Sequence, residues 1–252
     1  MRTKVIDEKT LGILSRVTII GNAIHLTCGQ LDRPDYVAVN KILEMMGGKW
    51  NKKEKAHLFP SDPTDALENI LLTGNITKYD DPLKKYGFFP TPPHHAKRMI
   101  ELADIKEGMT ILEPEAGQGG IADYIPKNCI VHCTEILPDN AKILRDKGYV
   151  VQEMDFLSQN ILQYDRVIMN PPFERQADID HVLHAFKFLV PGGKLVANMS
   201  NSITFRENKK TTDFRHFMFA YNGKIYENDP GTFKASGTMV NTVIITMTKN
   251  NN

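Results

Sequence analysis

The tetrapeptide Asn170-Pro171-Pro172-Phe173 follows the apolar run Val167-Ile168-Met169, which is typical of a short buried strand that ends in a turn. Two successive prolines supply no amide donors and keep the backbone extended, so the Asn170 side chain and nearby carbonyl groups form a cluster of hydrogen-bond acceptors. Such a cluster suits an amino group that donates two hydrogens, as the exocyclic amine of a base does, and Phe173 offers a face for stacking. A strand that simply ends in an Asn-Pro turn is the alternative.

Acidic and glycine residues follow three earlier predicted strands. The stretch from Glu113 to Gly120 is a glycine-rich turn between a strand and a helix, where a ligand can approach the backbone closely. The next strand ends at Glu135, eighteen positions after Gly117, and an acid there can accept both hydroxyls of a ribose. The third strand leads into Asp155-Phe156, an acid and an aromatic suited to an adenine ring. We therefore expect these strand ends to meet at one crevice that holds a nucleoside-like ligand beside the acceptor cluster.

These motifs follow one another as they do in amino-methylating, S-adenosylmethionine-dependent DNA methyltransferases. The segment Phe89-Pro90-Thr91-Pro92-Pro93 precedes the glycine turn and resembles the Thr-Pro motif of the adenine-N6 group. The resemblance covers about residues 86 to 250, and its specific part is this motif together with Asn-Pro-Pro-Phe. It implies a Rossmann-like class I methyltransferase domain, which is an α/β fold with a doubly wound, mostly parallel sheet and an antiparallel closing hairpin.

The resemblance also implies how the cofactor S-adenosylmethionine would bind. Thr91 would bind its methionine carboxylate, Glu113 would lie at its amino group, and Glu135 would take its ribose hydroxyls. Asp155 and the amide of Phe156 would contact the adenine edge. The complete implied set is Thr91, Glu113, Glu115, Ala116, Gly117, Gly119, Glu135, Ile136, Asp155, Phe156 and Asn170.

The implied reaction is methyl transfer to the N6 amine of adenine in DNA. Asn170 and the carbonyl of Pro171 would accept the two amine hydrogens, and Phe173 would stack on the base; the implied catalytic set is Asn170, Pro171, Pro172 and Phe173. Because that amine lies inside a duplex, the nucleotide must be flipped out or single-stranded. Phe233 resembles the second aromatic that sandwiches the flipped base, and a loop Phe that covers the sheet edge is the alternative.

The residue pattern of 1–85 differs from that of the rest of the chain. It predicts a small α+β module with a nucleic-acid or target-recognition role. The single Trp of the chain, Trp50, stands among Lys49, Lys52 and Lys53, a pattern that favours a phosphate backbone with a stackable base. A solvated turn whose Trp packs inward is the alternative. Since the chain ends soon after its last predicted strand, we expect recognition to come from this module, from a partner or from an insert.

The segment 202–216 is the candidate insert, and it carries Arg206, Lys209 and Lys210. We interpret it as a mobile substrate loop after a strand end, with a plain surface loop as the alternative. Asp180 and His181 fall at the start of the next predicted helix, where capping and packing are the simpler interpretation.

Hydrophobic periodicity predicts the elements that position these residues. In the module we expect a hairpin over 17–20 and 23–27, a helix over 36–46, two short strands within 49–59 and a helix over 65–72. In residues 86–250 the expected strands are 110–112, 130–134, 150–152, 166–169 and 194–198, with a closing hairpin of 224–226 and 242–247. The expected helices are 94–103, 121–125, 139–147 and 177–189.

The composition limits which binding sites and functions the chain can have. With 252 residues and a formal charge of +1, any nucleic-acid contact must come from local patches. The cysteines Cys28, Cys129 and Cys133 indicate reduced thiols in a cytoplasmic protein, and we expect no metal site and no membrane contact. The leading interpretation is a solitary DNA methyltransferase that acts on double-stranded DNA by base flipping, alone, as a homodimer or with a separate recognition partner. An RNA adenine methyltransferase, a protein-glutamine methyltransferase and a non-catalytic nucleic-acid-binding subunit are the alternatives.

Overall fold

The structure is a computed structural model that describes residues 4–27, 29, 31–60, 62–76, 90–234 and 240–251. The chain divides into two compact units, of which the smaller comprises 1–82 with 201–213 and the larger comprises 83–200 with 214–252. The sequence places the segment 201–213 in the larger domain, whereas its contacts group it with the smaller unit.

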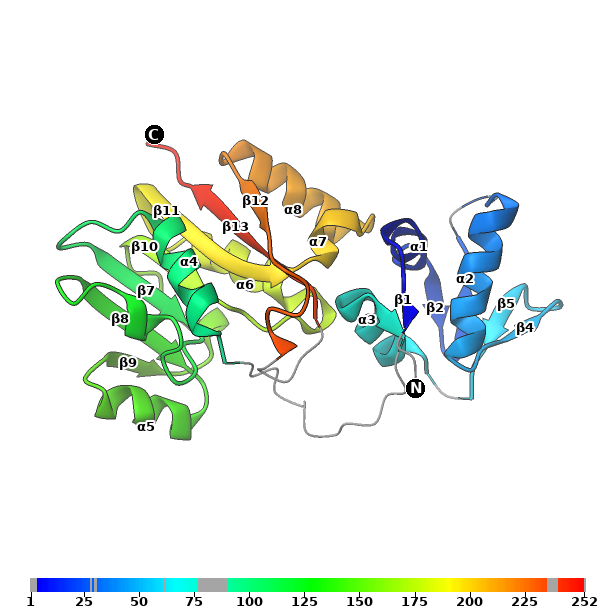
Figure 1. The fold of residues 1–252 in the computed structure, drawn as a ribbon, viewed down its shortest axis with the longest axis horizontal. Helices are drawn as coiled ribbons and strands as arrows, with labels where there is room; N and C mark the ends of the chain where they lie inside the picture. The colour runs from blue at the N-terminus through cyan, green and yellow to red at the C-terminus, as the bar shows by residue number, and fades with distance from the viewer. Residues whose placement is uncertain are drawn as a thin grey trace. The chain divides into compact units, whose positions relative to one another are not determined.

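The larger unit contains a seven-stranded sheet in the order β12-β13-β11-β10-β7-β8-β9 (Figure 1). The strands are β7 Thr110–Pro114, β8 Ile130–Glu135, β9 Val150–Glu153, β10 Tyr164–Met169, β11 Leu189–Ser200, β12 Lys224–Glu227 and β13 Thr242–Thr248. Strands β7 to β11 are parallel, and β13 runs antiparallel to both β11 and β12. The order reverses between β7 and β10, as it does at the switch point of Rossmann-like sheets. The predicted doubly wound α/β fold with a closing antiparallel hairpin is confirmed.

Helices cover both faces of this sheet, with α4 Pro93–Ala103 on one face and α6 Ala177–Phe186 on the other (Figure 1). Val196 of β11 packs with Ala96 and Met99 of α4. A third helix, α5 Pro138–Asp146, packs on β8 and β9. In the described ranges, no helix combines the length and the apolar character needed to cross a membrane.

The helix expected over 121–125 is wrong, because only one 3₁₀ turn, η2 Ala122–Tyr124, forms there. Gly119 and Gly120 precede this turn and Pro126 follows it, so too few residues remain for an α-helix. Two further 3₁₀ turns, η3 Phe156–Ser158 and η4 Glu174–Gln176, follow β9 and β10.

The smaller unit contains a four-stranded antiparallel sheet in the order β2-β3-β5-β4. Its elements are β1 Lys4–Val5, α1 Glu8–Leu14, β2 Thr18–Ile20, β3 Ala23–His25, α2 Arg33–Met45, β4 Lys49–Asn51, β5 Ala56–Leu58, α3 Thr64–Thr73 and β6 Asn75–Ile76. Leu14, Ile24 and Leu43 lie in its core. The predicted hairpin, the two predicted short strands within 49–59 and the two predicted helices are confirmed. The sequence prediction missed α1, although Asp7 caps it by accepting a hydrogen bond from the Thr10 amide at 2.9 Å.

The segment predicted as a mobile loop is helical, and it forms α7 Ser202–Phe205 and the first part of α8 Lys209–Ala220. Arg206 lies between these helices with 2% of its surface exposed, and its Nη2 lies 2.7 Å from Oε2 of Glu68 on α3. Glu207 forms a second ion pair, with Arg16, at 2.9 Å. The predicted nucleic-acid contact of Arg206 would require this buried guanidinium to leave the carboxylate that it holds in its own unit.

Candidate active site

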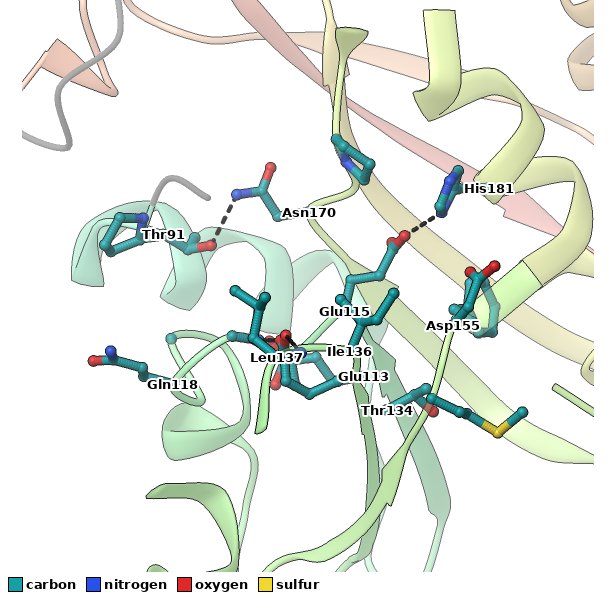
Figure 2. Close-up of a pocket in the computed structure, with 18 of the residues that line it drawn as sticks. Thr91, Glu113, Glu115, Gln118, Thr134, Ile136, Leu137, Asp155, Asn170 and His181 are labelled. Atoms are coloured by element: carbon teal, nitrogen blue, oxygen red, sulfur yellow. Dashed lines mark hydrogen bonds and ion pairs between the residues drawn. The ribbon is translucent and has the colours of Figure 1, made fainter. Parts of the chain in front are cut away.

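A cavity of about 400 Å³ opens at the carboxyl ends of β7, β8, β9 and β10 in the larger unit (Figure 2). Most of the residues implied as cofactor-binding or catalytic line it, namely Thr91, Glu113, Glu115, Ala116, Gly117, Glu135, Ile136, Asp155, Phe156, Asn170 and Pro172. Gly119, Pro171 and Phe173 lie outside the lining. The four strand ends that the sequence singles out therefore do meet at one place.

The glycine turn after β7 adopts backbone angles that favour glycine, with φ of 56° at Gly117 and 86° at Gly119. Gly120 is constrained by its neighbour instead, since a Cβ added there would lie 3.3 Å from the backbone nitrogen of Thr91. The Thr-Pro segment therefore passes directly over the glycine turn. Glu115 also has a positive φ, of 58°, which a non-glycine residue adopts at a cost in strain.

The carboxylate of Glu135 is held by backbone amides on both oxygens. Its Oε2 accepts a hydrogen bond from Gly117 at 2.7 Å, and its Oε1 accepts one from Leu137 at 2.8 Å. The side chain is 5% exposed and lines the cavity. Since each carboxylate oxygen has two lone pairs, the fixed carboxylate retains the capacity to accept the two hydroxyls of a ribose.

Glu113 is buried beneath the glycine turn, and its Oε2 accepts a hydrogen bond from the Ala122 amide at 2.6 Å. Burial raises the pKa of this carboxyl to about 8, and the bond from Ala122 offsets only part of that effect. A bound ammonium group would favour its ionised form.

Glu115 and His181 form an ion pair across the cavity wall through His181 Nδ1 (Figure 2). Burial raises the pKa of Glu115, and the hydrogen bond from His181 opposes this shift. Burial lowers the pKa of His181, but the hydrogen bond and the charge of Glu115 outweigh burial and leave that pKa raised. The simpler sequence interpretation, which gives His181 only capping and packing, misses its place at the cavity. Asp178 connects helix α6 to the end of β11, because it accepts a hydrogen bond from the Ser200 amide at 3.0 Å. Asp180 of the same helix is exposed.

Asp155 and Phe156 line the cavity at the end of β9. Asp155 caps η3 by accepting a hydrogen bond from the Leu157 amide at 3.0 Å, and its side chain is exposed. Phe156 is 2% exposed and packs against His184, with ring centroids 5.0 Å apart. Ile136 is 60% exposed and lines the same cavity, so a flat ligand could contact apolar surface from both residues.

Asn170 ends β10 beside the Thr-Pro segment, and its Nδ2 donates a hydrogen bond to Thr91 Oγ1 at 3.2 Å (Figure 2). Its Oδ1 accepts a bond from Asn198 Nδ2 at 2.8 Å. A carbonyl oxygen can accept two hydrogen bonds, so these contacts are compatible with a donor from a substrate.

The two aromatic residues expected to stack on a base are buried in this structure. Phe173 is 7% exposed, and Phe233 is 1% exposed with its ring edge-on to His95 at a centroid distance of 5.0 Å. The expectation that they present faces to a ligand is corrected accordingly, because large apolar rings beside the sheet gain more by packing inward. Residues 235–237, which follow Phe233 in its pattern, lie outside the described residues.

The basic residues predicted to contact nucleic acid differ in exposure. Lys49, Lys52 and Lys53 are exposed on and beside the β4–β5 turn of the smaller unit. Trp50 is 45% exposed and packs edge-on to His57 at 5.2 Å, so it does not pack fully inward. On α8, Lys209 is exposed and pairs with Asp213 at 2.6 Å, while Lys210 is half-buried.

Several cavity residues lie outside the sequence motifs, and they are Asp123, Thr134, Leu137, Lys147 and Met154. Lys147 reaches the turn from the end of α5, where its Nζ donates to the Gln118 carbonyl at 2.7 Å and lies 2.5 Å from Asp123 Oδ2. Only the packing of α5 brings this lysine to the cavity, so spacing along the chain could not reveal it. Leu137 could have been inferred, since it stands two residues beyond Glu135.

No protein-family model matches this chain, and no curated protein matches it. It resembles the solved structure of the 23S rRNA methyltransferase ErmE, with 20% identity over 65% of this chain and 70% of that chain at a TM-score of 0.48. The N-methyltransferase NodS from Bradyrhizobium japonicum WM9 has 10% identity over 62% of this chain and 95% of its own, at a TM-score of 0.48. The T. thermophilus 16S rRNA N2 G1207 methyltransferase RsmC, solved with AdoMet and guanosine, has 14% identity over 62% and 38%, at 0.45. The strand order of this chain assigns the fold independently of these likenesses.

Proposed function

We propose that this protein transfers a methyl group from S-adenosylmethionine to the N6 amine of adenine in DNA. The observation that carries the proposal is that Asn170 lines one cavity together with Glu113, Glu135 and Asp155. The methyl donor and the target amine must meet within one site. The three acids suit the methyl donor, and the hydrogen-bond acceptors at Asn170 suit the target amine.

The chemistry of the lining fits the cofactor. S-adenosylmethionine carries an ammonium, two ribose hydroxyls and an adenine amine, all of which donate hydrogen bonds. The carboxyl groups of Glu113, Glu135 and Asp155 supply acceptors for these donors. The methionine carboxylate needs a donor instead, and the backbone amide of Thr91, which lies close to Gly120 of the glycine turn, would supply it.

The proposed step uses Asn170 as an acceptor. Its Oδ1 would accept a hydrogen from the target amine, which raises the electron density on nitrogen. The nitrogen lone pair then attacks the methyl carbon, the carbon–sulfur bond breaks, and its electron pair stays on sulfur. The methylated nitrogen carries a positive charge and releases its proton to water, so catalysis rests on alignment and polarisation and needs no strong base.

Transfer of a labelled methyl group tests the proposal. The full-length protein is incubated with methyl-labelled S-adenosylmethionine and, separately, with double-stranded DNA, single-stranded DNA and structured RNA. Nucleosides released by enzymatic digestion are then separated. Label in N6-methyldeoxyadenosine supports the proposal, label in N6-methyladenosine alone assigns the enzyme to RNA, and absence of label from every polymer contradicts methyl transfer to nucleic acid.

A further inference from the structure

A row of hydrogen-bonded side-chain amides stands behind Asn170 in the larger unit. Asn198 of β11 is fully buried and donates its Nδ2 to Asn170 Oδ1 at 2.8 Å. Asn228 donates its Nδ2 to Asn198 Oδ1 at 3.3 Å, and Nη1 of Arg98 on α4 donates to Asn228 Oδ1 at 3.2 Å. The row therefore runs from Arg98 through two amides to Asn170.

The hydrogen bonds of this row run in one direction, from donor to acceptor, and Arg98 sets that direction. A guanidinium only donates hydrogen bonds, so the end of Asn228 that faces Arg98 must be its oxygen. The nitrogen of Asn228 then faces Asn198 and requires an oxygen there. The nitrogen of Asn198 in turn faces Asn170 and requires the Asn170 oxygen.

Two further contacts are compatible with the same direction, since a neutral imidazole and a hydroxyl can each take the role it requires. Nε2 of His95 lies 3.0 Å from Asn198 Oδ1, and it donates to that oxygen when it carries the ring proton. Burial lowers the pKa of His95 to about 4, so the ring is neutral near pH 7 and the Nε2–H tautomer satisfies this contact. At the far end, Thr91 Oγ1 accepts from Asn170 Nδ2.

We infer that Arg98, Asn228 and Asn198 are positioning residues, which fix the Asn170 amide with its oxygen as the acceptor for the target amine. The inference rests on the proposed function. Without the row, Asn170 can rotate by half a turn and present its NH2 group. The NH2 group of Asn170 and the target amine would then face each other as two donors, and the amine would lose its acceptor.

The test uses substitutions that change a donor of this row. Asn198→Asp keeps the shape but places an acceptor opposite Asn170 Oδ1, and we expect kcat to fall about 10- to 100-fold while the KM for the cofactor changes less than threefold. Because a buried charge can impair folding, Arg98→Met and Arg98→Lys form a second pair at a half-buried position. Arg98 Nη1 also donates to the Glu227 carbonyl at 2.9 Å, so Arg98→Met removes that bond as well. Lysine can still donate to Asn228, so Arg98→Lys should retain more of kcat than Arg98→Met.

The control is Tyr164→Phe, which removes a bond of 3.0 Å to His132 at the opposite end of β10. It should lower stability and leave kcat unchanged. The side-chain amide resonances of Asn170, assigned by their loss in Asn170→Ser, report its orientation without any need for activity. They should shift in Asn198→Asp and in Arg98→Met and stay in place in Tyr164→Phe.

Unchanged Asn170 resonances in both Asn198→Asp and Arg98→Met overturn the inference whether or not the wild-type protein methylates DNA. So does a wild-type kcat in both variants. Shifted resonances together with a lowered kcat and rescue by Arg98→Lys support it. A wild-type protein that transfers no methyl group to any polymer contradicts the proposed function, and the resonances still decide whether the row orients Asn170.

Discussion

The carboxylate of Glu135 accepts a hydrogen bond from the Gly117 amide at 2.7 Å, so the end of β8 is tied to the glycine turn that follows β7. One carboxylate thereby fixes the turn and also faces the cavity. The turn and the acid that the sequence treats as separate ligand contacts form a single structural unit.

The substitution Glu135→Gln should weaken cofactor binding about 10- to 100-fold, because one of its two oxygens becomes an NH2 group that faces a backbone amide donor or a ribose hydroxyl. Isothermal titration calorimetry with S-adenosylmethionine measures this. The control is Glu153→Gln, at the exposed end of β9, where only an ion pair with Arg145 is lost. Equal affinities for Glu135→Gln and the wild type would exclude the proposed ribose contact.

Glu113 makes the stability of the protein depend on pH. Its pKa is raised from 4.5 to about 8, so between these values the folded chain holds a proton that the unfolded chain releases. The free energy of unfolding contributed by this group therefore falls as pH rises from about 4.5 to 8. Glu113→Gln lacks this dependence, and its Tm should fall less than that of the wild type between about pH 5 and pH 8. Scanning calorimetry across this range tests it, with exposed Glu107→Gln as control; parallel curves for Glu113→Gln and wild type would contradict the expectation.

The lysines of the β4–β5 turn should contribute to nucleic-acid affinity. Lys52→Ala combined with Lys53→Ala should weaken DNA binding and reduce the slope of log affinity against log salt by about 2, since each phosphate contact contributes about 0.9. Fluorescence anisotropy at several salt concentrations measures the slope. Lys127→Ala, an exposed lysine of the larger unit, is the control. A slope that the double substitution leaves unchanged would remove this turn from the nucleic-acid interface.

Arg206 should stabilise the smaller unit. Arg206→Met leaves the Glu68 carboxylate without its bidentate partner and should lower the free energy of unfolding by about 2 to 3 kcal/mol. Lys209→Met removes a side chain that is 89% exposed, and its effect should stay within about 0.5 kcal/mol. Urea denaturation compares the two. Similar values for both variants would show that the buried pair adds nothing to stability.

The sequence predicts the elements that have strong periodicity and the residues at strand ends, because parallel strands bring their carboxyl ends to one edge of a sheet. It predicts Glu135 and Asn170 at the cavity for this reason. It does not predict the burial of Arg206 and Phe233, since their residue types suggest exposure to a ligand while packing partners within the fold decide their positions. It also fails for Asn198, whose importance depends on a contact with Asn170 that is 28 positions away.

The kcat of methyl transfer to adenine in Asn170→Ala and Asn170→Asp, measured with labelled S-adenosylmethionine, tests the central claim most directly. Alanine removes the acceptor and should lower kcat about 100- to 1000-fold, whereas aspartate retains acceptor oxygens and should keep part of the activity. Both variants should keep the wild-type fold by circular dichroism. Wild-type kcat in Asn170→Ala would contradict the account, because the acceptor at the end of β10 would then have no part in the reaction.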